Sequence, residues 1–282
     1  MTKNIKKYII TEAEMDPHAT VIMILKDLNP SFPLSLRVLA DYIKEKITDR
    51  PIEFHPYPLP TEATALCYCR PSFQKIRILL NSNRPMESQR FGGFHELGHL
   101  ALEHKIGILR IWGEDITGEE DPLERAQADQ FAVEMMMPET HVFQVATRFA
   151  HPLRLINEMK KTFGASMEAV IRRIVELRIY HGGFFLYDPW KLYFAYYTHD
   201  FDYTSQKLKD IMIYEYRRLR PGDFVERELP DGTMEYCVKW RNGQVLLALV
   251  QGRGSLYESL AKSWSHWFGI NFWEKRGKPD FA

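Results

Sequence analysis

The most constraining feature of the sequence is the run His95-Glu96-Leu97-Gly98-His99, which has the form H-E-x-x-H. Two histidines four residues apart lie on one face of an α-helix, close enough to share one metal ion. The glutamate beside the first histidine can reach a metal-bound water without being a ligand. Zinc lowers the pKa of such a water to about 7, so Glu96 can take its proton as the water attacks a peptide carbonyl. The motif predicts a Zn²⁺ site with His95 and His99 as ligands and Glu96 as general base.

The residues around the motif favour a helix. Between Gly92 and His104 there is no proline, and apolar residues recur at helical spacing. Gly98 lies inside this helix, where glycine costs about 1 kcal/mol relative to alanine, so we expect close packing at that position. His104 follows His99 by five residues. In a continuous helix this spacing rotates His104 by about 140°, so we predict a structural role for His104.

Composition excludes several classes of function. The chain has 37 basic and 37 acidic residues and a net charge of zero, which gives no electrostatic support for binding nucleic acid or an anionic membrane. It contains no run of about 18 apolar residues, and its first residues lack the apolar core of a signal peptide. Three cysteines are an odd number, which suits a reduced compartment. We therefore predict a cytoplasmic protein that neither enters a membrane nor binds DNA directly.

The chain before and after the motif alternates between helical and extended patterns. We predict helices over residues 20–28 and 36–47, and strands over 52–57, 63–69 and 76–81. Asp121-Pro122 is a typical helix start, and the helix that follows should end before Pro138. An extended substrate can pair with a strand close to a metal site. We assign this role to Ile76–Leu80, on the hypothesis that this strand lies at the open edge of the sheet.

Residues 150–180 predict two short helices, Pro152–Lys161 and Ser166–Arg178, with Ser166 as N-cap of the second. The spacing is similar to that of a helix–turn–helix, and the pair is basic through Lys160, Lys161, Arg172, Arg173 and Arg178. One interpretation is DNA binding. We favour a helical pair that packs on the predicted peptidase domain, because no evident set of side chains would read bases.

From residue 182 onward the composition shifts to aromatic strands. We predict strands over 184–187, 192–197, 234–240 and 244–250, and helices over 208–219 and 256–268. Asp231-Gly232 and Asn242-Gly243 are typical of hairpin turns. These features predict a separate α+β domain, whose role in sensing or partner binding the sequence leaves open.

The ordered combination of three segments resembles the ImmA/IrrE family of zinc metallopeptidases. The first is Arg90-Phe91 followed by the motif helix, which resembles the family pattern H-E-[LI]-[GS]-H-x4-H. The others are Gln127–Pro138, which contains Gln-Ala-Asp-Gln-Phe-Ala, and Phe163–Ile174. The resemblance covers about residues 20–180. It implies a regulatory endopeptidase whose protein substrate is a helix–turn–helix transcriptional repressor. Cleavage of that repressor would derepress stress or mobile-element genes.

The sequence departs from the family at the third metal ligand. The resemblance implies a glutamate three residues before Ala128, but that position is Arg125, which cannot bind zinc. Three alternatives stay open. In the first, which we favour, a one-residue shift brings Glu124 into the ligand position. In the second, Asp129 ligates the metal or positions a histidine. In the third, the site is degraded, and the protein is a non-catalytic regulator that binds a protein partner. Zn²⁺ is the predicted cofactor, ahead of Mn²⁺ or Co²⁺.

Taken together, these features predict an α+β protein of three parts. Residues 1–146 would form a small zincin-like metallopeptidase domain of helices and a short three-stranded sheet. Residues 147–181 would form the helix–turn–helix-like segment, and residues 182–282 the separate strand-rich α+β domain. The predicted metal ligands are His95, His99 and Glu124. The substrate bond, the trigger and the oligomeric state are left open by the sequence.

Overall fold

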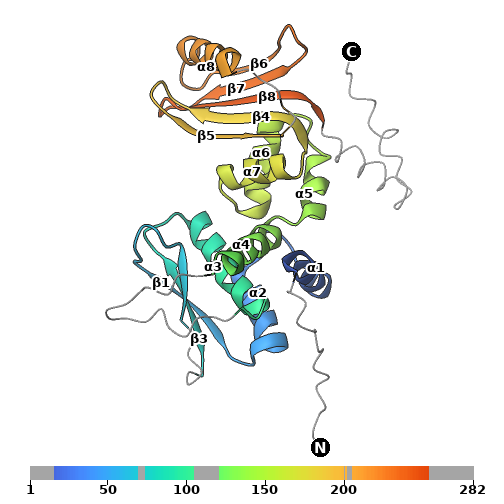
Figure 1. The fold of residues 1–282 in the computed structure, drawn as a ribbon, viewed down its shortest axis with the longest axis vertical. Helices are drawn as coiled ribbons and strands as arrows, with labels where there is room; N and C mark the ends of the chain where they lie inside the picture. The colour runs from blue at the N-terminus through green and yellow to red at the C-terminus, as the bar shows by residue number, and fades with distance from the viewer. Residues whose placement is uncertain (1–15, 69–73, 105–120, 200, 202–204, 254–282) are drawn as a thin grey trace, which may run out of the picture. The chain divides into compact units, whose positions relative to one another are not determined.

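The computed structural model describes residues 16–68, 74–104, 121–199, 201 and 205–253, and the structural statements below refer to these residues. The chain divides into two compact units, Met1–Pro138 with Thr162–Gly164, and Glu139–Lys161 with Ala165–Ala282. One contains a three-stranded sheet and the other a five-stranded sheet (Figure 1). The predicted α+β class is therefore confirmed, while the predicted boundaries at 146/147 and 181/182 stay predictions.

The first unit contains α1 (Pro17–Leu28), α2 (Leu36–Ile43), a π-helical turn (Lys44–Thr48), β1 (Ile52–Tyr57), β2 (Ala65–Tyr68), β3 (Ile76–Asn81), α3 (Met86–Ala101) and α4 (Pro122–Met136). Both α1 and α4 begin with an Asp-Pro pair. Asp121 accepts the N–H of Leu123 at 2.8 Å, and Pro122 occupies the first helical position, where no amide hydrogen is needed. The predicted start of this helix is confirmed.

The three-stranded sheet has the order β1-β3-β2, with β1 parallel and β2 antiparallel to β3. The prediction that Ile76–Leu80 forms the open edge is therefore wrong, because β3 is the central strand. Ile76 and Ile78 of β3 are fully buried. The apolar run that suggested a substrate-binding strand is what a strand with neighbours on both sides requires. Within the described part of the sheet, β1 and β2 are the edge strands.

Helix α3 packs close to its neighbours because it carries glycine at three contact points, Gly92, Gly93 and Gly98. A Cβ atom on Gly98 would lie 2.9 Å from the ring of Phe131 in α4, and one on Gly92 would lie 2.8 Å from the Cβ of Ala65 in β2. Neither distance is tolerated between carbon atoms. The expectation that Gly98 marks close packing is confirmed, and α3 is fixed between α4 and β2.

The second unit contains α5 (Glu139–Ala146), α6 (Pro152–Phe163), α7 (Met167–Glu176), β4 (Tyr180–Tyr187), β5 (Leu192–Tyr197), α8 (Ser205–Arg218), β6 (Phe224–Glu228), β7 (Met234–Lys239) and β8 (Val245–Arg253). The antiparallel sheet has the order β5-β4-β8-β7-β6. Helix α8 covers one face and α7 packs on the other, against β4 and β5 (Figure 1). Helix α7 therefore packs on the sheet of its own unit, whereas the favoured interpretation expected the basic helical pair to pack on the peptidase domain.

Local signals located most of the elements of this unit. Ser166 caps α7 by accepting the N–H of Ala169 at 3.2 Å, as predicted. The hairpin turns have Gly232 at φ 79° and Gly243 at φ 86°, a backbone region in which glycine is favoured. Strand β6 was not predicted. The predicted helix over 256–268 lies outside the described residues, as does Cys69. None of the described helices is long and apolar enough to cross a membrane.

Candidate metal centre

The H-E-x-x-H motif lies in α3, and its two histidines face each other. The Nε2 atoms of His95 and His99 are 3.1 Å apart. Two nitrogens bound to one tetrahedral zinc ion lie roughly 3.3–3.4 Å apart, given a zinc–nitrogen bond of about 2.0–2.1 Å. The spacing therefore fits a shared metal ion with almost no movement. His99 is buried at 8% exposure, whereas His95 is half-buried.

Asp129 of α4 controls the orientation of His95. Its Oδ1 atom lies 2.8 Å from Nδ1 of His95. When Nδ1 carries the hydrogen that Asp129 accepts, Nε2 keeps its lone pair and can bind a metal ion. Asp129 thus sits behind the histidine, on the side away from the predicted metal position.

His104 lies close to His99, so the prediction that it is rotated away is wrong. Helix α3 ends at Ala101, and Glu103 adopts a left-handed conformation with φ 50°. The chain folds back so that Nδ1 of His104 lies 2.9 Å from Nδ1 of His99. The rotation argument assumed a continuous helix through His104, and that assumption does not hold. On its other side, Nε2 of His104 is 2.9 Å from the amide oxygen of Gln127.

Glu124 lies near His99 and His104. One potential ligand atom each from His99, His104 and Glu124 lie within 4.8 Å of one another. Glu124 is in the first turn of α4 and is partly buried, whereas Arg125 is exposed. The start of α4 therefore presents Glu124, and not its neighbour, to the histidines. Histidine and carboxylate donors at this separation fit a divalent cation such as Zn²⁺.

Glu96 projects from α3 towards the edge strand β2. Its Oε2 atom accepts the backbone N–H of Cys67 at 3.0 Å. This bond fixes the carboxylate beside the strand that could take up an extended peptide. Sequence reasoning missed the contact because a backbone donor leaves no side-chain signal. It also missed the proximity of His104 to His99. The presence of a third histidine five residues after His99 was the signal that could have indicated it.

Comparison with known proteins finds a family model that matches the part of the chain holding these residues. Residues 48–175 match the model of the IrrE N-terminal-like domain, a peptidase family. No curated protein matches the chain. Among solved structures, a Mycobacterium tuberculosis transcriptional regulator is similar with a TM-score of 0.50 and 13% sequence identity, covering 84% of this chain and 88% of that chain. At that identity the likeness concerns the fold alone. The family match confirms the resemblance to ImmA/IrrE metallopeptidases.

Proposed function

Because residues 48–175 form an IrrE N-terminal-like domain, we propose that this chain is a zinc-dependent endopeptidase that cleaves a regulatory protein. The observation that carries the proposal is the pairing of His95 and His99 through Nε2 atoms 3.1 Å apart. Asp129 supports the first histidine from behind, and Glu124 is the proposed third ligand. His95, His99 and Glu124 would supply three protein ligands and leave a position for water, as catalytic zinc sites require. Glu124 lies within 4.8 Å of His99 and His104, in a group of potential ligands that does not include His95.

When bound, a zinc ion would polarise the scissile carbonyl and lower the pKa of a bound water. Glu96 performs the proton transfer. It takes the proton of the attacking water and passes it to the leaving amine, the usual role of a positioned carboxylate. Its hydrogen bond to Cys67 holds the carboxylate in place before substrate arrives, so little reorganisation is needed.

The edge strand β2 is the proposed binding position for the substrate backbone. An extended segment can add to an exposed sheet edge through main-chain hydrogen bonds, with side-chain pockets giving specificity. Because Glu96 contacts β2 at Cys67, a segment paired along β2 would place a peptide bond near the general base. From the family resemblance, we propose a helix–turn–helix transcriptional repressor as substrate, and the cytoplasm as the location where both proteins meet.

The first test is the metal content of the purified full chain. We expect about one equivalent of zinc at this centre in the wild type and its loss in Glu124→Ala and in His99→Ala. Arg125→Ala serves as control, since its side chain is exposed on the same helix and is expected to leave the zinc in place. Absence of zinc from the wild type after purification without chelator would end the peptidase proposal.

The second test separates cleavage from binding. Lysate of the source organism is incubated with wild type or with Glu96→Gln, and new protein N-termini are identified by mass spectrometry. Glu96→Gln is expected to keep its zinc, because Glu96 is not a ligand, and to lose at least 10²-fold in cleavage. New N-termini that arise equally with both proteins would contradict the role of Glu96.

Arg125, at the position where the resemblance implies a ligand, favours a second function. A chain with a weakened centre would act as a non-catalytic regulator that binds its partner through the peptidase fold. This alternative predicts little zinc in the wild type and no dependence of regulation on Glu96. The two tests above therefore distinguish it from the enzyme.

A further inference from the structure

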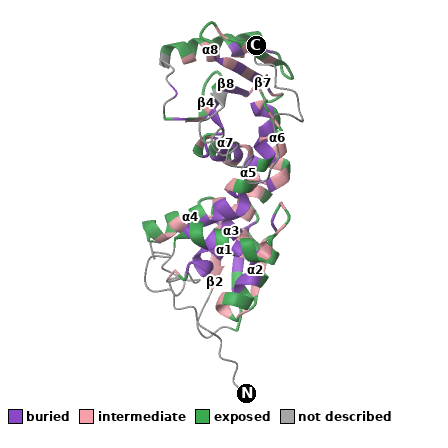
Figure 2. Cartoon of the chain, turned by 90° about the vertical axis from the view of Figure 1, so that its right-hand side faces the viewer, coloured by how far each residue is buried: buried purple, intermediate pink, exposed green. Residues whose placement is uncertain are grey.

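A second cluster of potential metal ligands lies in the other unit, beneath α8. Glu215 of α8 and Glu235 and Cys237 of β7 are each fully buried, at 0% exposure. One ligand atom from each of the three residues lies within 4.8 Å of the others. Helix α8 is largely exposed (Figure 2). Over residues 206–218 the other residues are exposed or partly exposed, so the one buried side chain there is the carboxylate of Glu215.

Sheet register brings a further polar group to this face. Cys237 pairs with Leu247 of β8, which in turn pairs with Phe185 of β4, so these side chains share a face. Tyr187 follows Phe185 by two residues and therefore points to the same side. These residues belong to one core cluster, and Tyr187 is only 2% exposed. A core of this kind is normally apolar, so the two carboxylates within it require an explanation.

Two buried polar atoms in this cluster have no hydrogen-bond partner among the described residues. They are Oε1 of Glu235 and the hydroxyl of Tyr187. Tyr187 belongs to the same buried core cluster as Cys237. Leaving a buried polar atom unpaired costs about 1–3 kcal/mol. Two such atoms beside the same carboxylates indicate an occupant that they would contact.

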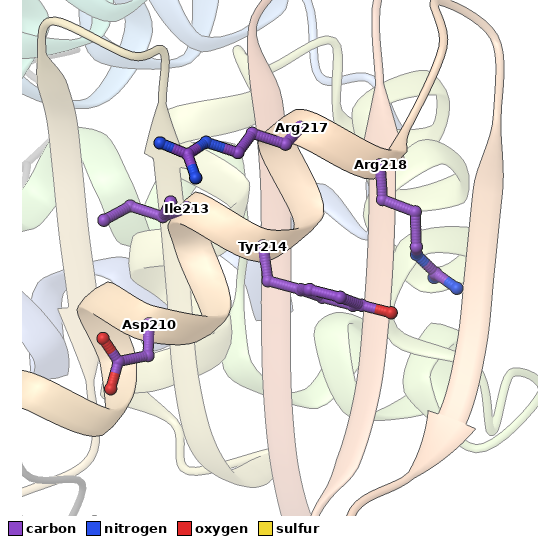
Figure 3. A pocket seen from close by; sticks show the side chains of 5 residues that line it. All are labelled: Asp210, Ile213, Tyr214, Arg217 and Arg218. Atoms are coloured by element: carbon purple, nitrogen blue, oxygen red, sulfur yellow. The ribbon is translucent and has the colours of Figure 1, made fainter.

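The arginines around the cluster bind other carboxylate oxygens and leave Oε1 of Glu235 available. Arg227 donates to Oε1 of Glu215 and to Oε2 of Glu235, both at 2.8 Å, and Arg218 donates to Oε2 of Glu215 at 3.2 Å. Figure 3 shows Tyr214 and Arg218 projecting from the same side of α8, and the ring of Tyr214 also contacts Arg227. A carboxylate oxygen that accepts one hydrogen bond keeps a second lone pair, so Glu215 can still act as a ligand.

We propose that Glu215, Glu235 and Cys237 bind a divalent metal ion that accepts sulfur and oxygen ligands, such as Zn²⁺. The Tyr187 hydroxyl would lie beside this ion. Cysteine and carboxylate are both ordinary zinc ligands. Ligand atoms around a tetrahedral zinc ion lie roughly 3.4–3.6 Å apart, so from separations within 4.8 Å the cluster needs to contract by up to about 1.4 Å. Small rotations of the two glutamate side chains supply that movement.

Glutamate and cysteine bind a cation in their deprotonated forms, so two carboxylates and a thiol together offer up to about three negative charges to a divalent ion. A hollow of about 360 Å³ is lined by Tyr187, Asp188 and residues of α8 such as Met212 and Tyr216.

Cobalt(II) titration of the full chain tests the site. Cobalt bound to a thiolate gives a ligand-to-metal charge-transfer band in the near ultraviolet, whereas the histidine centre on α3 has no predicted thiolate ligand. We expect the band in the wild type, with about one equivalent of cobalt per chain producing it. Cys237→Ser is expected to abolish the band, and Glu235→Gln to weaken cobalt binding at least 10-fold.

Two comparisons make the outcome decisive. Glu226→Gln changes a carboxylate on the neighbouring strand β6 whose side chain is exposed, so the band is expected to persist. His99→Ala removes the proposed first centre and is also expected to keep the band, so failure of one proposal is distinguishable from failure of the other. Absence of the band from the folded wild type would overturn the site. So would a band that survives in Cys237→Ser, because the thiolate would then belong to another cysteine.

Discussion

Asp129 is the residue through which the candidate centre on α3 is oriented. Its carboxylate holds the Nδ1 atom of His95 at 2.8 Å and thereby directs Nε2 at the metal position. We predict that Asp129→Ala lowers zinc affinity by about 10–100-fold without abolishing binding, as is typical when the partner of a ligating histidine is removed. Competition with a chromophoric chelator measures this affinity.

The size of this effect also decides the role of Asp129. Complete loss of zinc in Asp129→Ala, with retention in Glu124→Ala, would mean that Asp129 is itself the third ligand. Asp129→Asn is a matched variant, since its amide oxygen can still accept the Nδ1 hydrogen. Its zinc affinity is expected to lie between those of the wild type and Asp129→Ala.

His151 gives the second unit a pH-dependent stability. Its Nδ1 atom accepts the N–H of Leu153 at 3.2 Å at the start of α6, and its ring lies 4.5 Å from that of Tyr236. Burial lowers the pKa of His151 below 6.5, although the nearby Glu226 opposes this shift. Between the lowered pKa and 6.5 the unfolded chain binds the proton that the folded chain does not, so stability falls as the pH falls.

We therefore predict that the second unit loses stability when the pH is lowered from 8 through 6.5 and below. The contribution of His151 is fully present above pH 6.5 and is lost as the pH falls to the folded-state pKa. Urea denaturation at several pH values measures it. In His151→Asn the side-chain oxygen can still cap α6 but does not titrate in this range. An equal pH dependence in this variant would assign the effect to other groups.

At the scale of elements, the spacing between α3 and α4 depends on Gly98. A methyl group there would meet the ring of Phe131 at 2.9 Å and the backbone oxygen of Ala128 at 3.3 Å. Alanine gains about 1 kcal/mol in helix propensity, but overpacking of this kind costs about 1–3 kcal/mol. We predict that Gly98→Ala is destabilising in net and weakens zinc binding, because His99 and Glu124 lie on the two separated helices.

A double-mutant cycle checks the cause. Phe131→Leu makes room for the added methyl group, so Gly98→Ala should destabilise the Phe131→Leu background less than it destabilises the wild type. Denaturant unfolding of the four proteins gives the coupling energy. Additive effects would mean that Phe131 is not the obstacle.

Elements were predictable wherever a local signal decided their position. The Asp-Pro pair located α4, and the Asn-Gly and Asp-Gly pairs located two hairpin turns. The order of strands in the sheet was not predictable, because an apolar run such as Ile76–Leu80 has the same sequence pattern in an edge strand as in a central strand. Strand β6 was missed for a related reason. Its exposed and partly exposed residues Phe224–Glu228 alternate at the sheet edge without a continuous apolar pattern.

The same distinction applies to the candidate centre. The placement of His95 and His99 on one helix face follows from spacing alone. The proximity of His104 to His99 depends on where α3 ends. The left-handed residue that turns the chain back is Glu103 and not a glycine, so the sequence gives no sign of this turn. The choice between Glu124 and Arg125 depends on the rotation of α4, which packing against α3 sets. Tertiary contacts decide the position of His104 and the choice of Glu124, and these contacts cannot be inferred from the local sequence.

At the scale of the whole molecule, each unit has its own core. In the first, Phe94, Phe131 and Ile78 are fully buried; in the second, Leu247, Leu249 and Cys237 are. Units with separate cores are expected to unfold in separate steps. Scanning calorimetry of the full chain should therefore resolve two transitions. A single transition whose calorimetric and van't Hoff enthalpies agree would contradict this expectation.

The two proposed metal sites divide between these units, so zinc should move each transition through a different set of residues. A ligand present at 100 times its Kd stabilises the unit that binds it by about 2.7 kcal/mol, while a chelator reverses the effect. In His99→Ala, zinc is expected to raise only the transition of the second unit. In Cys237→Ser it is expected to raise only that of the first. A shift of both transitions in either variant would mean that the units share one binding event. No shift in the His99→Ala variant would argue against a metal ion beneath α8, and no shift in Cys237→Ser would argue against one on α3.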